Sequence, residues 1–396
     1  MNILYVSCLC SDHKMHELFD TAKEKPHPAP QKYHSLMVKG LVANKQNVTC
    51  LVSLPVTKRS HPKHKWWRWK DEMEGNVHYV YMPFYNHPVP KLLGFKIFAF
   101  FYTLIWSLRT SGKKVMICDV LNPHAFASMR ACKLTGVKSV GIVTDIPGYM
   151  NFDKKKVSLI EKLEQQHAIR NLRRMSALIP LTDAMCDIIN PQRKKTYTVI
   201  EGMVDSRMKN FEPIPFGDNK RHITYTGSLN EAFGIRMLIE GFMLLKQKDI
   251  VLDIYGAGQV EKDMNNYMKR DERIRFHGMV SVEEAVKAQL SSYLLVNPRP
   301  TTEDFTKYSF PSKNMEYMVT GVPLLTAVLP GMPVEYHPNV FLFEDETVTG
   351  LSHKLNEILN MPEEIVKARG RQGKMFVMEN KNNIRQAERV VKMLEQ

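Results

Sequence analysis

The residues best suited to chemistry lie in a basic loop and at the start of the helix predicted after it. Arg299 and Lys313 carry the positive charge that a bound diphosphate needs, and Ser312 stands where the helix is expected to begin. Glu316 follows one turn later, where its carboxylate could accept hydrogen bonds from a ribose diol. The alternative is that Lys313 and Glu316 are solvated charges on a helix surface. The spacing therefore predicts a nucleotide-diphosphate site and leaves plain surface charge open.

Glycine-containing turns supply a second set of candidate ligands. Gly227 and Ser228 end one expected strand, and Gly256 and Gly258 end another. Backbone N–H groups exposed at such turns can bind phosphate, although a single Gly-Ser turn is a weak signal. Asp145 ends a further apolar run, where it could accept hydrogen bonds from sugar hydroxyls or cap the following helix.

These side chains must be positioned by parallel strands whose carboxyl ends share one edge of a sheet. The apolar run 293–296 predicts one such strand, which ends before Pro298, and a short helix then runs from Ser312 toward Gly321. At the other end of the chain, residues 1–9 predict a strand and residues 11–32 a long polar loop. An amphipathic helix and a second strand complete a βαβ unit.

The run SFPSKNMEYMVTGVPLL, residues 309–325, resembles the nucleotide-binding helix of retaining glycosyltransferases of family 4, in the branch with an SFPSK-type loop that serves exopolysaccharide and capsule synthesis. The pieces YTGSL, VLDIYGAG and IRFHGMV extend the resemblance over most of residues 220–330. The amino-terminal half matches only in outline. The resemblance implies an α/β chain of the GT-B fold, with two Rossmann-like domains whose parallel sheets face each other across a cleft.

The resemblance also implies roles and boundaries. Arg299 and Lys313 would neutralise the leaving diphosphate, and Asp145 stands where the family often has a histidine near the reacting sugar. We expect an acceptor-side domain at residues 1–206 and a donor-binding domain at 207–372. Residues 373–396 are expected to form a helix that crosses back to the first domain.

The chain departs from the family pattern at three further positions. Ser228 and Phe233 fall near the places where the family commonly has Arg and Lys in the phosphate turn. Tyr308 replaces the first of two glutamates that the family places eight residues apart, and only the second, Glu316, is present. Branches with an SFPSK-type loop also lack the first glutamate. We therefore interpret Tyr308 as a variant of the family pattern and not as a loss of activity.

The leading hypothesis is a retaining glycosyltransferase that moves a sugar from a UDP-linked donor to a glycan or lipid-linked glycan. No metal or other cofactor is expected, since the two cationic side chains could carry the charge and the sequence contains no Asp-x-Asp motif. The alternatives are a catalytically silent GT-B protein that binds a partner or a membrane, and a sugar-nucleotide epimerase. The sugar, the acceptor and the linkage are not specified by the sequence.

Charge and cysteine content bear on the compartment and the partners. Residues 1–200 hold 30 Lys and Arg against 14 Asp and Glu, which accounts for more than the whole net charge of +14. No nucleic-acid reader motif accompanies this excess, so nucleic acid is not an expected partner. Six cysteines without regular spacing indicate reduced thiols, and no signal peptide is visible. We therefore expect a cytoplasmic protein.

Two amino-terminal segments raise the question of a membrane. Residues 58–70 combine Lys and Arg with three Trp, a composition that suits an anionic headgroup region or an ordinary surface loop. Residues 92–108 are apolar except for Lys96. They could form a buried helix of the domain, an interfacial helix, a membrane span or a protein-binding surface. We expect peripheral attachment to an anionic membrane on the inner face of the plasma membrane.

Overall fold

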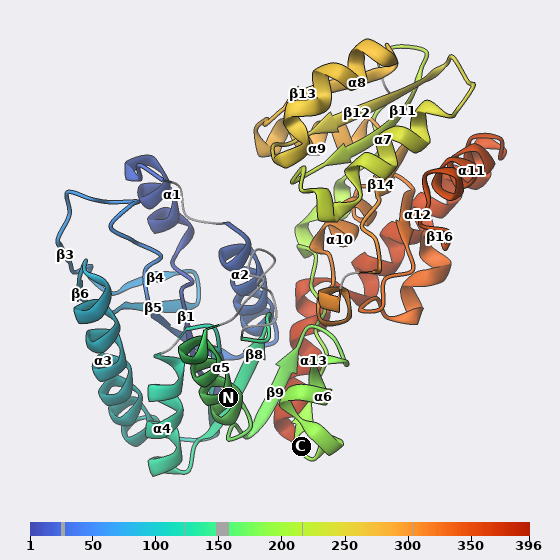
Figure 1. Cartoon of the computed structure of the whole chain (residues 1–396). Helices are drawn as coiled ribbons and strands as arrows, with labels where there is room; N and C mark the ends of the chain where they lie inside the picture. The colour runs from blue at the N-terminus through green and yellow to red at the C-terminus, as the bar shows by residue number, and fades with distance from the viewer. Residues whose placement is uncertain (25–27, 123, 148–157, 216, 303) are drawn as a thin grey trace. The chain divides into compact units, whose positions relative to one another are not determined.

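The computed structural model describes residues 1–24, 28–122, 124–147, 158–215, 217–302 and 304–396. The chain forms two compact units (Figure 1). The first unit comprises Met1–Met203 and Asn383–Gln396, and the second comprises Val204–Asn382. The passage between units thus lies close to the expected boundary after residue 206, whereas residues 373–380 still belong to the last helix of the second unit.

The first unit is built on an eight-stranded sheet in the order β10-β9-β8-β7-β1-β2-β5-β4, which is parallel except for β4 at one edge. The central strands are almost wholly buried, as expected for strands covered by helices on both faces. The strands are β1 (Asn2–Ser7), β2 (Asn47–Val52), β4 (Glu72–Glu74), β5 (Val77–Tyr81), β7 (Lys114–Asp119), β8 (Lys138–Val143), β9 (Ala177–Pro180) and β10 (Thr196–Tyr197).

The prediction of a polar loop over residues 11–32 is wrong. Helix α1 (Asp12–Thr21) occupies the first part, and α2 (Pro28–Ala43) begins within it. The Ser11 hydroxyl caps α1 by accepting a hydrogen bond from the Lys14 N–H at 3.2 Å. Leu18 is the buried residue of α1, so a local cap and one apolar contact hold a helix that lacks a continuous apolar face.

Helix α3 (Pro88–Arg109) contains the apolar segment 92–108 and lies against α4 (Ala125–Thr135). One face of α3 is buried in the domain and the remaining residues of the helix are half-buried or exposed. At the start of α3, the two-residue strands β3 (Trp66–Trp67) and β6 (Phe84–Tyr85) pair antiparallel (Figure 1). Helices α5 (Leu159–Leu172) and α6 (Met185–Ile189) complete the regular elements of this unit before the chain passes to the second.

The second unit has a six-stranded parallel sheet in the order β13-β12-β11-β14-β15-β16. Numbered within the unit, this order is 3-2-1-4-5-6, the arrangement of a doubly wound nucleotide-binding sheet. The first three strands are added toward one edge of the sheet and the last three toward the other, so the order reverses between the first and fourth strands. The strands are β11 (Arg221–Thr226), β12 (Ile250–Tyr255), β13 (Ile274–Gly278), β14 (Leu294–Asn297), β15 (Leu324–Ala327) and β16 (Phe341–Phe343).

Helices cover the second sheet and bury two apolar cores. The larger core joins β11, β12 and β14 to α7 and α11, and the smaller one joins β14 and β15 to α10. The helices are α7 (Ile235–Met243), α8 (Met264–Arg270), α9 (Val282–Leu290), α10 (Ser312–Met318), α11 (Val348–Leu359) and α12 (Glu363–Asn380).

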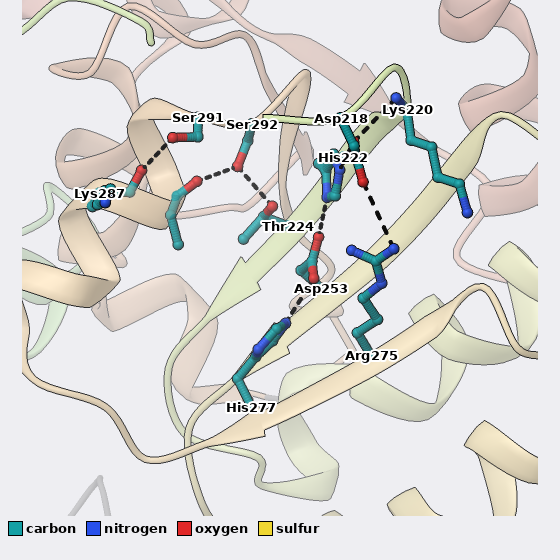
Figure 2. Close-up of polar contacts among 11 residues, drawn as sticks. Asp218, Lys220, His222, Thr224, Asp253, Arg275, His277, Lys287, Ser291 and Ser292 are labelled. Atoms are coloured by element: carbon teal, nitrogen blue, oxygen red, sulfur yellow. Dashed lines mark hydrogen bonds and ion pairs between the residues drawn. The ribbon is translucent and has the colours of Figure 1, made fainter. Parts of the chain in front are cut away.

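A polar cluster centred on the buried Asp253 ties three strands of this sheet together (Figure 2). The Asp253 carboxylate lies between His222 Nδ1 at 2.5 Å and His277 Nε2 at 2.7 Å, and His222 Nε2 is 2.8 Å from Asp218. Burial raises the pKa of Asp253, but the hydrogen bonds from both histidines outweigh burial and hold it below its ordinary value. Since the three central residues come from β11, β12 and β13, the cluster fixes these strands side by side.

The last helix, α13 (Asn383–Glu395), belongs to the first unit, where it packs along α2. Gly40 on α2 permits this approach, because a Cβ there would lie 2.1 Å from the Asn383 carbonyl oxygen and 2.8 Å from Ala387 Cβ. The Asn44 amide also donates to the Ile384 carbonyl at 2.9 Å. The contact therefore brings the two backbones close together at Gly40, where a side chain cannot be accommodated.

We expect Gly40→Ala to destabilise the protein by about 1–3 kcal/mol, because α13 must move away from α2 to admit the methyl group. The matched control is Gly94→Ala on α3, where a Cβ meets nothing within 4 Å and alanine favours the helix. Thermal melting followed by circular dichroism compares the two. Equal melting temperatures for both variants would contradict the close packing of α2 and α13.

Candidate functional site

The predicted diphosphate residues meet where the strand order of the second sheet reverses. Gly227 directly follows β11, and Arg299 lies two residues beyond the end of β14, the neighbouring strand. Helix α10, which carries Lys313, follows the same loop. Because loops on the two sides of such a reversal diverge, they leave room for a ligand at the carboxyl ends of the strands.

Lys313 reaches directly over the Gly227 turn. Its Nζ donates a hydrogen bond to the Thr226 carbonyl at 2.5 Å and lies 4.8 Å from the centre of the Tyr225 ring. A Cβ on Gly227 would stand only 1.5 Å from this Nζ, and the φ angle of +148° also favours glycine. The turn thus needs glycine because the lysine amine occupies the place of a side chain.

The electrostatics of Lys313 follow from its surroundings. Burial lowers the pKa of its amine to about 8, the Glu316 carboxylate opposes this effect, and the positive charge of Arg299 adds to it. A buried amine whose pKa is lowered further by a neighbouring cation is a favourable site for an anion, because the negative charge offsets both the repulsion and the desolvation.

Arg299 lies between two phenylalanine rings. Its guanidinium carbon is 4.5 Å from the ring centre of Phe305 and 5.2 Å from that of Phe233. One Nη donates to the Ser309 hydroxyl at 3.3 Å, while the buried Nε has no hydrogen-bond partner within the described residues. Burial lowers the pKa of Arg299 to about 10, so the side chain remains charged at neutral pH.

The predicted glycine turns pack against each other. The Gly227 N–H donates to the Tyr255 carbonyl at 2.9 Å, and a Cβ on Gly256 would lie 1.8 Å from the Gly227 oxygen. A Cβ on Gly258 would lie 2.7 Å from the Leu229 backbone, and Ser228 is exposed at the tip of its turn. The backbone predicted to contact the nucleotide is therefore one continuous surface formed by two turns.

Tyr317 supports this arrangement and was not singled out from the sequence. Its buried hydroxyl accepts a hydrogen bond from the Thr226 N–H at 2.8 Å and lies 3.0 Å from the Thr226 carbonyl. Gln289 donates to the Thr226 hydroxyl at 2.8 Å. Tyr317 and Lys313 are one turn apart on α10. The hydrogen bond between Tyr317 and Thr226 therefore pairs the backbone at the end of β11 and also fixes α10 so that Lys313 lies over Gly227. In the run SKNMEYM, Tyr317 is buried together with Met315 and Met318.

Ser312 and Glu316 flank this contact on α10. Ser312 is exposed and Glu316 is half-buried. The loop before α10 is held by Glu346, whose carboxylate accepts the Thr301 N–H at 2.9 Å. Glu346 follows β16 and has no sequence motif that could have assigned it to this loop.

Asp145 belongs to the first unit, at the carboxyl end of β8. Burial, together with the negative charge of Asp119 at the end of β7, raises the pKa of Asp145 to about 6. Asp119 lies 3.3 Å from His34 Nε2, and His34 Nδ1 is 2.7 Å from the Tyr5 hydroxyl. This series of contacts from Tyr5 through His34 to Asp119 was not predicted from the sequence, because His34 lies within a helix whose pattern indicates only apolar packing.

His124, which ends the loop after β7, is a core histidine. It is 2% exposed, and burial lowers its pKa to about 4, so the ring is neutral at physiological pH. Its Nε2 has no hydrogen-bond partner in the part of the chain that the structure describes. The ring packs edge-on against Phe95 of α3 at 5.7 Å.

Comparison with known proteins adds to this geometry. Residues 220–361 match the family model described as glycosyl transferases group 1. The matched segment covers β11 through α11 and so contains Gly227, Arg299 and Lys313. A search of curated proteins finds no match.

Solved structures match both units together. Sucrose-phosphate synthase from Thermosynechococcus elongatus has a TM-score of 0.69 at 12% identity, covering 100% of this chain and 99% of that one. The fold is GT-B. HepE from Anabaena in complex with UDP matches this GT-B chain with a TM-score of 0.64 at 11% identity, over 100% of both chains. The lipopolysaccharide outer core galactosyltransferase WaaB in its apo form gives 0.61 at 15% identity, over 100% and 99%.

We expect Tyr317→Phe to destabilise the second unit by about 1–3 kcal/mol, because the buried Thr226 N–H loses its partner. The control is Tyr255→Phe on the neighbouring strand, a hydroxyl for which the described residues show no hydrogen bond. Urea unfolding of the two variants and the parent measures the difference. A Tyr317→Phe variant as stable as Tyr255→Phe would show that the bond to Thr226 is not needed.

Proposed function

We propose that this protein is a glycosyltransferase that takes its sugar from a nucleotide-diphosphate donor, UDP-linked in our expectation. The observation that carries the proposal is the pair of cations, Lys313 and Arg299, held beside the Gly227 turn where the sheet order reverses. The match of residues 220–361 to glycosyl transferases group 1 supports it. So does the fold shared with HepE, solved in complex with UDP and with UDP-glucose.

The proposed reaction follows from where the charge develops. The bond between the anomeric carbon and the β-phosphate oxygen breaks, and a bond forms from that carbon to the acceptor hydroxyl oxygen. The acceptor proton passes to the departing diphosphate, which carries the developing negative charge. Lys313 and Arg299 stabilise that charge more in the transition state than in the bound donor. We expect no metal cofactor because these two side chains supply the positive charge.

The finer assignments are also proposals. Glu316 would accept hydrogen bonds from the ribose hydroxyls, since it lies one turn beyond Lys313. Asp145, ionised above about pH 6, would accept hydrogen bonds from a sugar hydroxyl. We propose transfer with retention of configuration to a glycan or lipid-linked glycan in polysaccharide synthesis. A cytoplasmic location is supported by six free cysteines.

A catalytically silent GT-B protein is the second candidate function. The exposed Ser228 turn brings no side-chain charge of its own to the phosphate position, and Tyr308 stands where the family has a first glutamate. This candidate and the transferase both bind nucleotide, but only the transferase releases free UDP from a UDP-sugar when an acceptor is present.

We expect the double variant Lys313→Ala/Glu316→Ala to bind UDP at least tenfold more weakly than the parent, because a charge-assisted contact contributes about 1.5–3 kcal/mol. The matched control, Lys354→Ala/Glu357→Ala, removes a lysine and a glutamate at the same spacing on α11, where they pair at 2.9 Å. Isothermal titration with UDP and GDP measures binding. No binding of either nucleotide to the parent protein would refute the donor site.

UDP affinity should also depend on pH through Lys313. Its amine is protonated below about pH 8, so binding is strongest there. Above that value the free protein must take up a proton to bind the diphosphate, and affinity should fall by up to about tenfold per pH unit.

Titrations between about pH 7 and pH 9 measure this effect. The Lys313→Arg variant serves as the control, because its guanidinium stays charged across the range. A pH dependence that is identical in the parent and in Lys313→Arg would exclude Lys313 as its source.

A further inference from the structure

Apart from Phe95, helix α3 buries small and polar residues, while most of its exposed residues are large and apolar. The positions facing the protein are Phe95, Ala99, Thr103 and Ser107. The Thr103 hydroxyl donates to the Ser128 hydroxyl of α4 at 2.9 Å. A surface helix of a globular protein normally has the opposite arrangement, with the apolar stripe inward.

The outer face of α3 carries a line of apolar side chains, here called the outer stripe. Successive members are four or three residues apart, so they lie along one side of the helix for about 30 Å. Single exposed apolar residues are ordinary, but a contiguous line of this length marks an interaction site. The members are Val89 (70% exposed), Leu93 (58%), Ile97 (51%), Phe101 (56%), Ile105 (47%) and Leu108 (70%).

The charges around the outer stripe are almost all positive. The sequence contains no Asp or Glu between Glu74 and Asp119. Lys96, Arg109 and Lys113 are exposed on α3 and just beyond it. Asp71 is the acidic residue whose charge reaches the helix, at Tyr102.

An exposed tryptophan lies near the start of the helix. Trp66 on β3 is 74% exposed and pairs with Tyr85 on β6, the strand that leads into α3 (Figure 1). Lys65 and Arg68 beside it are exposed as well. An indole flanked by cations suits the boundary between lipid headgroups and acyl chains.

We propose that the outer stripe of α3 inserts into the surface of an anionic lipid bilayer, with the helix parallel to the membrane plane. Its composition and length would also suit a span. However, its inner face packs on α4, and the chain then enters β7, which is paired on both sides by β1 and β8. An interfacial helix keeps all these contacts and needs only the outer stripe to leave water. Lipid is favoured over protein as the occupant because exposed cations lie on the helix at Lys96, at its end and beside Trp66.

The proposal does not depend on nucleotide binding, so the two can fail separately. The test is sedimentation of the full-length protein with vesicles of phosphatidylcholine alone or with about one third phosphatidylglycerol. We expect binding to the anionic vesicles at low salt, weaker binding at high salt, and little binding to the neutral ones. The variant Ile97→Ser/Phe101→Ser/Ile105→Ser should bind the anionic vesicles at least tenfold more weakly.

Matched controls keep the test specific. Leu134→Ser on α4 and Ile365→Ser on α12 each remove an exposed apolar side chain outside the stripe and should bind vesicles like the parent. Circular dichroism and UDP titration should be unchanged in all variants, since the altered side chains are exposed. Arg109→Gln/Lys113→Gln should lose part of the binding to anionic vesicles.

Either of two kinds of result would overturn the proposal. One is a parent protein that stays in the supernatant with both vesicle types, or a stripe variant that sediments as the parent does. The other is a dimer, detected by light scattering, that the stripe variant loses while neither protein binds vesicles. The stripe would then be an interface between copies of this chain.

Discussion

The reversal of strand order within each parallel sheet is the constraint on which the rest of the structure depends. In the second unit the reversal lies between β11 and β14, and in the first unit it lies between β1 and β7. At such a point the loops after two adjacent strands turn to opposite faces, so the strand ends are not covered by their own connections. The Gly227 turn, Arg299 and Lys313 gather at one reversal, and Asp119 with His34 at the other.

Strand ends that are not covered by their own connections leave backbone N–H and C=O groups without partners. In this protein side chains provide those partners. Tyr317 bonds both backbone groups of Thr226. Glu346 does the same for the loop after β14. These buried polar contacts hold Lys313 over Gly227 before any ligand arrives, which is the preorganisation that charge stabilisation requires.

Much of the second unit follows from local sequence. The run 293–296 and the Pro311-Ser312 start of α10 lie within a residue of their observed positions, because short apolar runs bounded by proline leave few alternatives. The prediction of a loop over residues 11–32 was wrong because the local sequence there carries little periodic signal. Helix α1 has one buried residue and no continuous apolar face, so periodicity could not reveal it, although the Ser11 cap was a usable local signal.

The sequence by itself determined the strands, the turns and the residue types of the candidate site, since these depend on neighbours along the chain. Tertiary structure alone decided which of them meet. The Thr226 bond to Tyr317 and the Asp253 bonds to His222 and His277 join residues far apart in sequence. The exposed face of α3 was equally undecided, because an apolar helix has the same sequence signature whether its second face meets protein or not. Only the packing of α3 against α4 showed which side of the helix remains exposed.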